Sequence, residues 1–299
     1  MIQRPSQEIF TQLIVLLLLV ILFSALGQGI SYLILKTGGV SFDQGVIGEI
    51  DSASKRQLTR LALAVGHMTS FLVSSFIFLY IYHNSNEWTF LKLNSVPGTT
   101  FLYLSFFLLV SSYPLVGKIG EFNASIPLPE WMQTSSESAM DLLQNILTME
   151  SGWELVMSFF LVAIVPAIGE EVLYRGIVQT KFQRLIGNNH LGIIVASLFF
   201  SLNHMQFDRF LPFALLGIIL GYAYYYSRTL WVPVILHLIN NGFQVLVLYN
   251  MEESVASMDL NDLPQIPTAI LLISLLATIG IFVLLKMHSE KVYEQRTTA

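Results

Sequence analysis

Eight long runs of apolar residues, separated by polar stretches, divide the chain. A run of about 18 or more apolar residues can cross the roughly 30 Å hydrocarbon core of a bilayer as an α-helix. The runs lie near residues 10–35, 60–83, 99–117, 153–175, 190–205, 210–227, 230–250 and 266–287. The fifth and sixth are short, and the turn MQFDR separates them. The pattern predicts an all-α fold, a polytopic membrane bundle of about eight transmembrane helices.

The longest loop, residues 118–152, is acidic and contains a further amphipathic stretch. In the sequence SAMDLLQNILTM, helical spacing brings Met140, Leu143, Ile146 and Leu147 near one face. This pattern is typical of an interfacial helix lying on the bilayer, and equally of a solvated loop helix. The sequence does not decide between these two settings.

Composition supports a membrane protein. Hydrophobic residues make up 54% of the 299 positions and charged residues only 12%, whereas a soluble chain carries about 25% charged residues. The first apolar run continues to Leu35, which is too long for the apolar region of a signal peptide, so we expect a retained helix. No repeat or composition shift marks a second domain, and residues 1–299 are predicted to form a single integral-membrane domain.

Charge and cysteine content exclude several kinds of site. The net charge of −5 leaves no basic patch for nucleic acid, and the absence of cysteine excludes disulfides, thiolate metal sites and a cysteine nucleophile. Nine of the fifteen Lys and Arg residues fall on the side of the bundle that carries both termini. The positive-inside rule therefore predicts a multi-pass protein of the cell membrane, in contact with the lipid bilayer, with cytoplasmic termini.

Ionisable residues inside the predicted spans are candidates for function, because charges are costly in hydrocarbon. The stretch GEEVLYRG, at 169–176, carries Glu170, Glu171 and Arg175. Glu171 and Arg175 are four residues apart, so they share a helix face and can form an ion pair. Glu170 is rotated by about 100° from Glu171 and needs a partner from another helix or a role of its own.

Two further predicted helices carry polar pairs at the same spacing. Phe200 and His204 are four residues apart in FSLNH, and His237 and Asn241 are four apart in HLINN. Each pair presents its side chains on one helix face. His67, alone in LALAVGHMTSF, is interpreted as a core histidine without a catalytic role.

If these helices converge, they bring together a carboxylate, two imidazoles and an amide. Such a set can hydrolyse a bond, with Glu170 as general base toward water and a histidine sharing that task. A second histidine and an amide can donate hydrogen bonds to a developing oxyanion. Glu170, His204 and His237 can instead be zinc ligands, although the two-histidine zinc-protease signature is absent. The spacing leaves both possibilities open.

The stretches EEVLYR, FSLNH and HLINN resemble the motifs EExxxR, FxxxH and HxxxN of the CPBP family. This family covers CAAX prenyl proteases and bacteriocin-processing or immunity proteins, also called the Abi family, and its fold is a bundle of about eight helices. In this chain the motif-bearing core spans about residues 150–250. The resemblance implies an intramembrane endopeptidase that acts on a membrane-associated peptide or protein, of CAAX type or bacteriocin-like.

The resemblance also implies a role for each motif residue. Glu170 and His204 would activate the attacking water, and His237 and Asn241 would form the oxyanion hole. Glu171 belongs to the same catalytic set, and the supporting residues are Arg175, which would hold Glu171, and Phe200, which opens the second motif. The family has been described both as metalloproteases and as metal-independent glutamate proteases, so the implied cofactor is either Zn²⁺ or none.

Two other classes of function fit the same residues. A non-catalytic immunity or scaffold protein would use the polar cluster for structure and for binding a partner. An ion-coupled transporter would use Glu170 and the histidines as a proton relay. The sequence shows no inverted repeat, which counts against the transporter.

Overall fold

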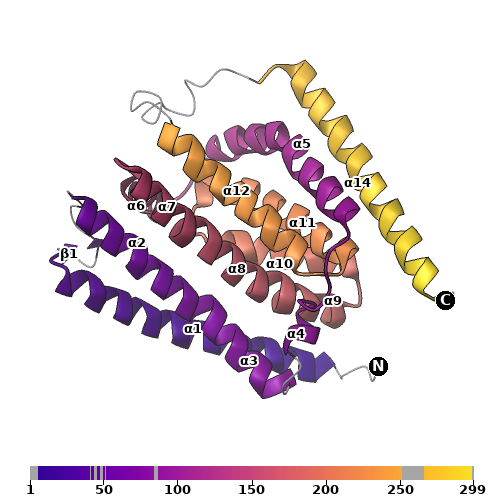
Figure 1. The fold of residues 1–299 in the computed structure, drawn as a ribbon, viewed down its shortest axis with the longest axis horizontal. Helices are drawn as coiled ribbons and strands as arrows, with labels where there is room; N and C mark the ends of the chain where they lie inside the picture. The colour runs from indigo at the N-terminus through magenta and orange to yellow at the C-terminus, as the bar shows by residue number, and fades with distance from the viewer. Residues whose placement is uncertain are drawn as a thin grey trace.

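The chain folds into a bundle of long helices (Figure 1). The structure is a computed structural model, and it describes residues 6–40, 42–43, 46–47, 50, 52–83, 87–250 and 266–297. Within these residues the sole strands are β1 (Phe42–Asp43) and β2 (Val46–Ile47), which form a two-residue antiparallel pair in the first loop. The predicted polytopic all-α fold is therefore confirmed, with this small exception.

Among the described residues, seven helical stretches are long and apolar enough to cross a membrane. They are Ser6–Thr37, Ala53–His83, Thr99–Ala124, Gly152–Ile186, Phe207–Ser227, Trp231–Asn250 and Thr268–Glu294. An eighth apolar helix, Asn189–Leu202, is shorter. Its 14 residues extend about 21 Å at 1.5 Å per residue, less than the hydrocarbon thickness. Each of the eight predicted runs thus corresponds to a helix, but the fifth does not span a bilayer by its own length.

The first three spans lie in the N-terminal half of the chain. They are formed by α1 (Ser6–Thr37), by α2 (Ala53–His67) with the π-helical segment η1 (Met68–Val73) and α3 (Ser74–His83), and by α5 (Thr99–Ala124). The short helix α4 (Glu87–Phe90) precedes α5, and α6 (Glu130–Leu147) follows it.

The fourth span is built from five consecutive helical segments without a break. These are α7 (Gly152–Ser158), the π-helical η2 (Phe159–Ile164), α8 (Val165–Glu171), the π-helical η3 (Val172–Gln179) and α9 (Thr180–Ile186). The chain continues through α10 (Asn189–Leu202), the 3₁₀ turn η4 (Phe207–Arg209), α11 (Phe210–Ser227), α12 (Trp231–Asn250) and α14 (Thr268–Thr297).

The fourth span lies at the centre of the bundle (Figure 1). Its segment α8 contacts α2 and η1 on one side and α12 on the other, while η3 contacts α10 and α11. The helices α1 to α3 form one flank, and α5 and α14 form the other. Both ends of the described chain lie at the same end of the bundle (Figure 1). Residues near the middle of the fourth span are therefore surrounded by protein.

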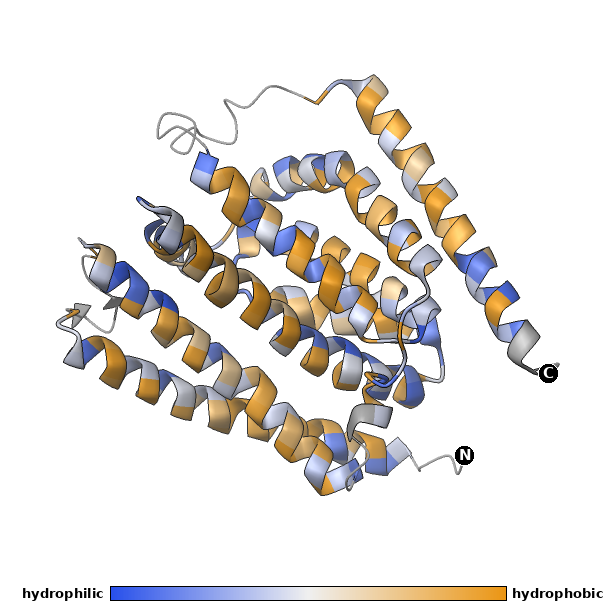
Figure 2. Cartoon of the chain, in the orientation of Figure 1, coloured by the Kyte–Doolittle hydropathy of each residue, from blue (hydrophilic) through white to orange (hydrophobic). Residues whose placement is uncertain are grey.

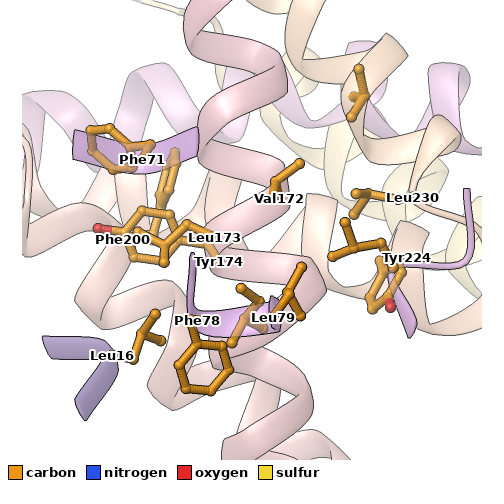
Figure 3. Packing of buried hydrophobic residues seen from close by; sticks show 13 residues of the cluster. Leu16, Phe71, Phe78, Leu79, Val172, Leu173, Tyr174, Phe200, Tyr224 and Leu230 are labelled. Atoms are coloured by element: carbon orange, nitrogen blue, oxygen red, sulfur yellow. The ribbon is translucent and has the colours of Figure 1, made fainter. Parts of the chain in front are cut away.

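A buried aromatic and aliphatic cluster packs around η3 (Figure 3). The ring of Tyr174 lies 6.2 Å from that of Phe71 in η1 and 5.3 Å from that of Phe200 in α10. Between helices in lipid, such packing is stabilised by van der Waals contact and interhelical hydrogen bonds. The cluster fixes η3, and with it the two glutamates that directly precede it, against two other helices.

Hydrophobic residues run along the outer helices of the bundle (Figure 2), and many of their large side chains are exposed. Leu17 and Leu22 of α1 and Ile273 and Leu276 of α14 are each more than half exposed. Soluble monomers rarely expose apolar patches of this extent. These faces fit contact with lipid tails, as expected for a multi-pass membrane protein.

Helix α6 turns its predicted apolar face toward the protein. Ile146 and Leu147 are buried against Val245 of α12, and Leu143 packs at the edge of the same cluster. Met140 lies nearer the start of α6, where its sulfur is 3.9 Å from Arg209. The face that suggested a helix on the bilayer or in solvent is thus largely occupied by contacts with the bundle.

A buried ion-pair cluster anchors the C-terminal end of α6. Arg60 donates to the carbonyl oxygens of Ile146 and Thr148 at 2.6 Å each, and to Glu154 at 3.1 Å. Arg56 binds the same carboxylate at 3.0 Å. The last carbonyl groups of a helix have no partner within the helix, and here a guanidinium supplies one. The cluster ties α6 to α2 and α7.

Candidate active site

The three sequence motifs converge on one cavity of about 550 Å³ in the centre of the bundle. Its walls come from α5, α6, the fourth span, α10, α11 and α12. Five of the predicted site residues line it, namely Glu170, Phe200, His204, His237 and Asn241. The structure therefore brings together residues that are up to 71 positions apart in the sequence.

Glu171 and Arg175 form the predicted ion pair, and they lie behind the cavity wall. The distance from Glu171 Oε1 to Arg175 is 2.6 Å, and both side chains are almost fully buried. Arg175 also donates to the Gly217 carbonyl at 3.2 Å, and its guanidinium lies 4.5 Å from the centre of the Phe200 ring. The same Glu171 oxygen accepts a hydrogen bond from His237 Nδ1 at 2.7 Å. The pair thus both neutralises charge and orients a cavity histidine.

Glu170 receives its partners from other helices. Its Oε1 lies 3.0 Å from His67 Nε2, and its Oε2 lies 3.7 Å from His237 Nε2. Oε2 is buried and has no hydrogen-bond partner among the described residues. One carboxylate oxygen of Glu170 is therefore held by His67, while the other is buried near His237 without a hydrogen bond from the described residues, in a residue that lines the cavity.

The backbone sets the tautomer of His204. Its Nδ1 lies 2.9 Å from the carbonyl oxygen of Phe200, and a carbonyl only accepts hydrogen bonds. Nδ1 therefore carries the hydrogen, which leaves Nε2 with a lone pair. The imidazole stacks on Phe213 with ring centres 4.3 Å apart. A fixed histidine whose Nε2 can accept a proton thus faces the cavity.

Amide groups complete the wall on α12. Asn240 donates from Nδ2 to Asn241 Oδ1 at 3.3 Å, and Tyr113 of α5 donates to Asn240 Oδ1 at 3.4 Å. Because its oxygen is engaged, the NH₂ group of Asn241 is the part free to donate elsewhere. Asn240 and Tyr113 were not among the predicted site residues.

The local backbone of the fourth span is irregular at the glutamates. The seven-residue α8, which ends at Glu171, lies between π-helical segments η2 and η3. Pro166, near the start of α8, has no N–H to donate to the preceding turn. π-helical turns are uncommon and occur frequently at functional sites, where they change the direction of side chains.

The structure corrects our interpretation of His67. We expected a lone core histidine, but its imidazole contacts the Glu170 carboxylate and only 18% of its side chain is exposed. The sequence did indicate a possible role for His67, since any ionisable residue in a membrane span is a functional candidate. The sequence does not show that Glu170 is the partner of His67, because the two residues are 103 positions apart.

The predicted zinc ligands do not converge as a set. Within the described residues, no group of three His, Asp or Glu side chains is arranged to hold a metal ion. Glu170 Oε1 faces His67, and the Nδ1 atoms of His204 and His237 are bound to the Phe200 carbonyl and to Glu171, so a metal could bind only Glu170 Oε2 and the two Nε2 atoms. We derive no step through a metal at this site.

Comparison with known proteins agrees with the motif assignment. Residues 152–243 match the family described as type II CAAX prenyl endopeptidase Rce1-like. Over 96 residues the chain is 34% identical to the membrane-embedded CAAX protease MroQ of Staphylococcus aureus (strain USA300). This similarity covers 30% of the chain and 38% of the relative.

No solved structure matches the chain. The family match begins at the start of α7 and ends within α12, so it contains all three motifs and excludes His67. This match and the motif geometry agree with the resemblance to the CPBP family that the three motifs indicate.

Proposed function

We propose that this protein is an intramembrane endopeptidase that hydrolyses a peptide bond of a membrane-associated substrate. The single observation that carries the proposal is the common cavity, in which Glu170, His204, His237 and Asn241 meet although they come from three separate helices. The families to which the chain is similar support the same class of reaction. The precise roles below are our assignment.

Glu170 and His204 activate the attacking water. Glu170 lines the cavity, its buried Oε2 has no hydrogen-bond partner among the described residues, and His204 Nε2 carries a lone pair. Both can accept a hydrogen bond from one water molecule, which is the arrangement that general base catalysis needs. The water oxygen attacks the carbonyl carbon while its proton passes to one of these two groups.

His237 and Asn241 stabilise the oxyanion that forms. His237 donates from Nδ1 to Glu171, so a second donation from Nε2 requires hydrogens on both ring nitrogens. The resulting cation would lie between two carboxylates, 2.7 Å from Glu171 and 3.7 Å from Glu170. Glu171 then acts as the orienting carboxylate, as the aspartate of a serine-protease triad does.

The second step breaks the carbon–nitrogen bond. The tetrahedral intermediate collapses, and the proton taken from water passes to the departing nitrogen. The products are a carboxylate and an amine, and no further reactant is required. The proposed sequence uses one water molecule and groups of this chain alone.

The proposed substrate is a peptide segment at the membrane, and a CAAX-type C-terminus is the first to test. The similar protein from Staphylococcus aureus is named a CAAX protease. The cavity lies within a bundle whose outer faces are apolar, so a lipid-associated peptide can approach it from the bilayer. We further propose that the protein resides in the cell membrane with cytoplasmic termini.

Cleavage of a quenched fluorescent peptide library by purified protein tests the proposal. Glu170→Ala and His204→Ala should each lower the rate by about 100-fold or more, because each removes a proton acceptor. Matched controls are Glu290→Ala, whose side chain is 55% exposed, and His190→Ala at the other end of α10; both should cleave like the wild type. Normal cleavage by both cavity variants would refute the proposal.

A further inference from the structure

One residue outside the family-matched segment touches the proposed general base. His67 is the last residue of α2, and its Nε2 lies 3.0 Å from Glu170 Oε1. The matched segment begins only at residue 152, so this contact belongs to none of the three motifs. The site assembled by the motifs therefore has a fourth helix behind its central carboxylate.

The surroundings of His67 fit its ring closely. The imidazole stacks on Phe71, with ring centres 4.2 Å apart and an angle of 20° between the planes. On the other side lies Gly169, directly before Glu170. A Cβ atom at position 169 would lie 3.0 Å from His67 Cε1 and 3.1 Å from Nδ1. The absence of a side chain at this position lets the ring reach the carboxylate.

The two ring nitrogens of His67 have different surroundings. Nδ1 is buried and has no hydrogen-bond partner in the described part of the chain, whereas Nε2 faces the carboxylate. A buried N–H without an acceptor is costly, while a carboxylate is a strong acceptor. The hydrogen therefore belongs on Nε2, which donates it to Glu170 Oε1.

Both helices change their hydrogen-bonding pattern at this contact. The π-helical segment η1 begins at Met68, directly after His67, and η3 begins at Val172, two residues after Glu170. The two segments contact each other, and η1 also contacts α8. Such backbone irregularity is found where a helix redirects a functional side chain.

We propose that His67 is a positioning residue: its Nε2–H holds Glu170 Oε1, so that Oε2 stays unpaired and is the oxygen that accepts the proton of the attacking water. The role rests on the proposed function, since it matters only if Glu170 accepts a proton there. A purely structural role would reside in the ring stacked on Phe71. The two roles separate chemically, because one needs an N–H donor and the other needs an aromatic ring.

Two substitutions separate these roles by kinetics on the same peptide substrate. His67→Phe keeps the ring and removes the donor, and it should lower kcat by about 10- to 100-fold with KM nearly unchanged, the loss expected for one hydrogen bond to a charged group. His67→Gln removes the ring and keeps an N–H donor, and it should recover activity to within about fivefold of the wild type. A fully active His67→Phe, or a His67→Gln as slow as His67→Phe, would overturn the role.

A third variant moves the ring without changing it. Gly169→Ala places a Cβ against His67 and should lower kcat in the same direction as His67→Phe. Gly280→Ala in α14 is the matched control, because no atom lies within 4 Å of the added Cβ, and it should match the wild type. Full activity of Gly169→Ala, with the fold retained, would contradict the proposed dependence on the His67 contact.

Solid-state NMR of protein with ¹⁵N-labelled histidine tests the contact without any activity. The His67 signals, identified by their absence in His67→Gln, should show hydrogen on Nε2 and should shift in Glu170→Gln. Bare Nε2, or signals unchanged by Glu170→Gln, would overturn the role whatever the kinetics show. Wild-type protein that cleaves nothing would overturn the proposed function and this role together, whereas active wild type with equally active His67→Phe would overturn the role alone.

Discussion

At the scale of single residues, one carboxylate oxygen of Glu171 binds two partners. It accepts from Arg175 at 2.6 Å and from His237 at 2.7 Å, in a place without solvent exposure. A buried charge that loses its partner is strongly destabilising, because it can neither reach water nor find another counter-charge. The ion pair should therefore affect stability and catalysis by separate routes.

Substitutions of Arg175 and Glu171 should separate the effect on stability from the effect on catalysis. Arg175→Met alone should destabilise the protein by about 3–5 kcal/mol, since Glu171 stays buried without its cation. Adding Glu171→Gln should restore much of that stability, because no charge then remains unpaired, but activity should stay low since His237 loses its carboxylate. Thermal unfolding in detergent and peptide cleavage measure the two effects. Equal stability of the single and double variants would contradict this account.

Sequence spacing predicted the contact between Glu171 and Arg175 within one helix, but it did not predict which helix supplies a partner to Glu170. Glu171 and Arg175 are four residues apart, so helical geometry alone places them together. The need of Glu170 for an external partner also followed from its rotation on the helix. That the partner is His67 depends on how α2 packs against α8, and no local pattern carries that information.

At the scale of elements, α6 is held over the cavity by its C-terminal end. Leu143 and Leu147 of α6 line the cavity, and Arg60 binds the carbonyl groups of Ile146 and Thr148 at that end. Residues 125–129 alone join α6 to the end of α5. Besides its apolar contacts with α12, the C-terminal end of α6 is therefore held by one buried guanidinium.

Removing that guanidinium should loosen α6. Arg60→Met leaves the Glu154 carboxylate with one fewer partner and the two carbonyl groups unpaired, so hydrogen exchange of residues 140–148 should become faster by about tenfold or more, the effect of about 1.4 kcal/mol. Ser54→Ala, at an exposed position nearer the start of α2, is the control. Unchanged exchange in α6 would show that Arg60 does not anchor it.

The sequence predicted the helices better than their internal irregularities. All eight apolar runs correspond to helices because the bilayer imposes their length and composition. The π-helical segments η1, η2 and η3 leave no trace in hydrophobic periodicity, since apolar residues occur on all sides of these spans. The shortness of α10 was visible in the sequence, and the structure shows that α10 ends at Leu202, two residues before His204.

At the scale of the whole molecule, the cavity lies among helices whose order along the chain fixes its surroundings. Both chain ends lie at one end of the bundle, and α6 lies toward the other (Figure 1). The excess of Lys and Arg on the side of the termini predicts that this end is cytoplasmic. The cavity lining contains Leu143 and Leu147 of α6, so this part of the cavity would then lie toward the outer side of the membrane.

Cysteine accessibility tests this orientation, and the chain has no cysteines of its own to interfere. Glu130→Cys at the start of α6 should react with a membrane-impermeant maleimide in intact cells. Glu290→Cys in α14 should react only after the membrane is permeabilised. The reverse pattern would show that the termini lie outside.

The central claim is that Glu170 performs peptide hydrolysis inside the bundle. The most direct measurement compares membrane-associated peptides by mass spectrometry in cells that carry wild-type protein, Glu170→Gln or the control Glu290→Gln, with part of the water replaced by H₂¹⁸O. The account predicts new C-termini that carry ¹⁸O in the wild type and in Glu290→Gln, and their loss in Glu170→Gln by about 100-fold or more. The same set of peptides in the wild type and Glu170→Gln would contradict it.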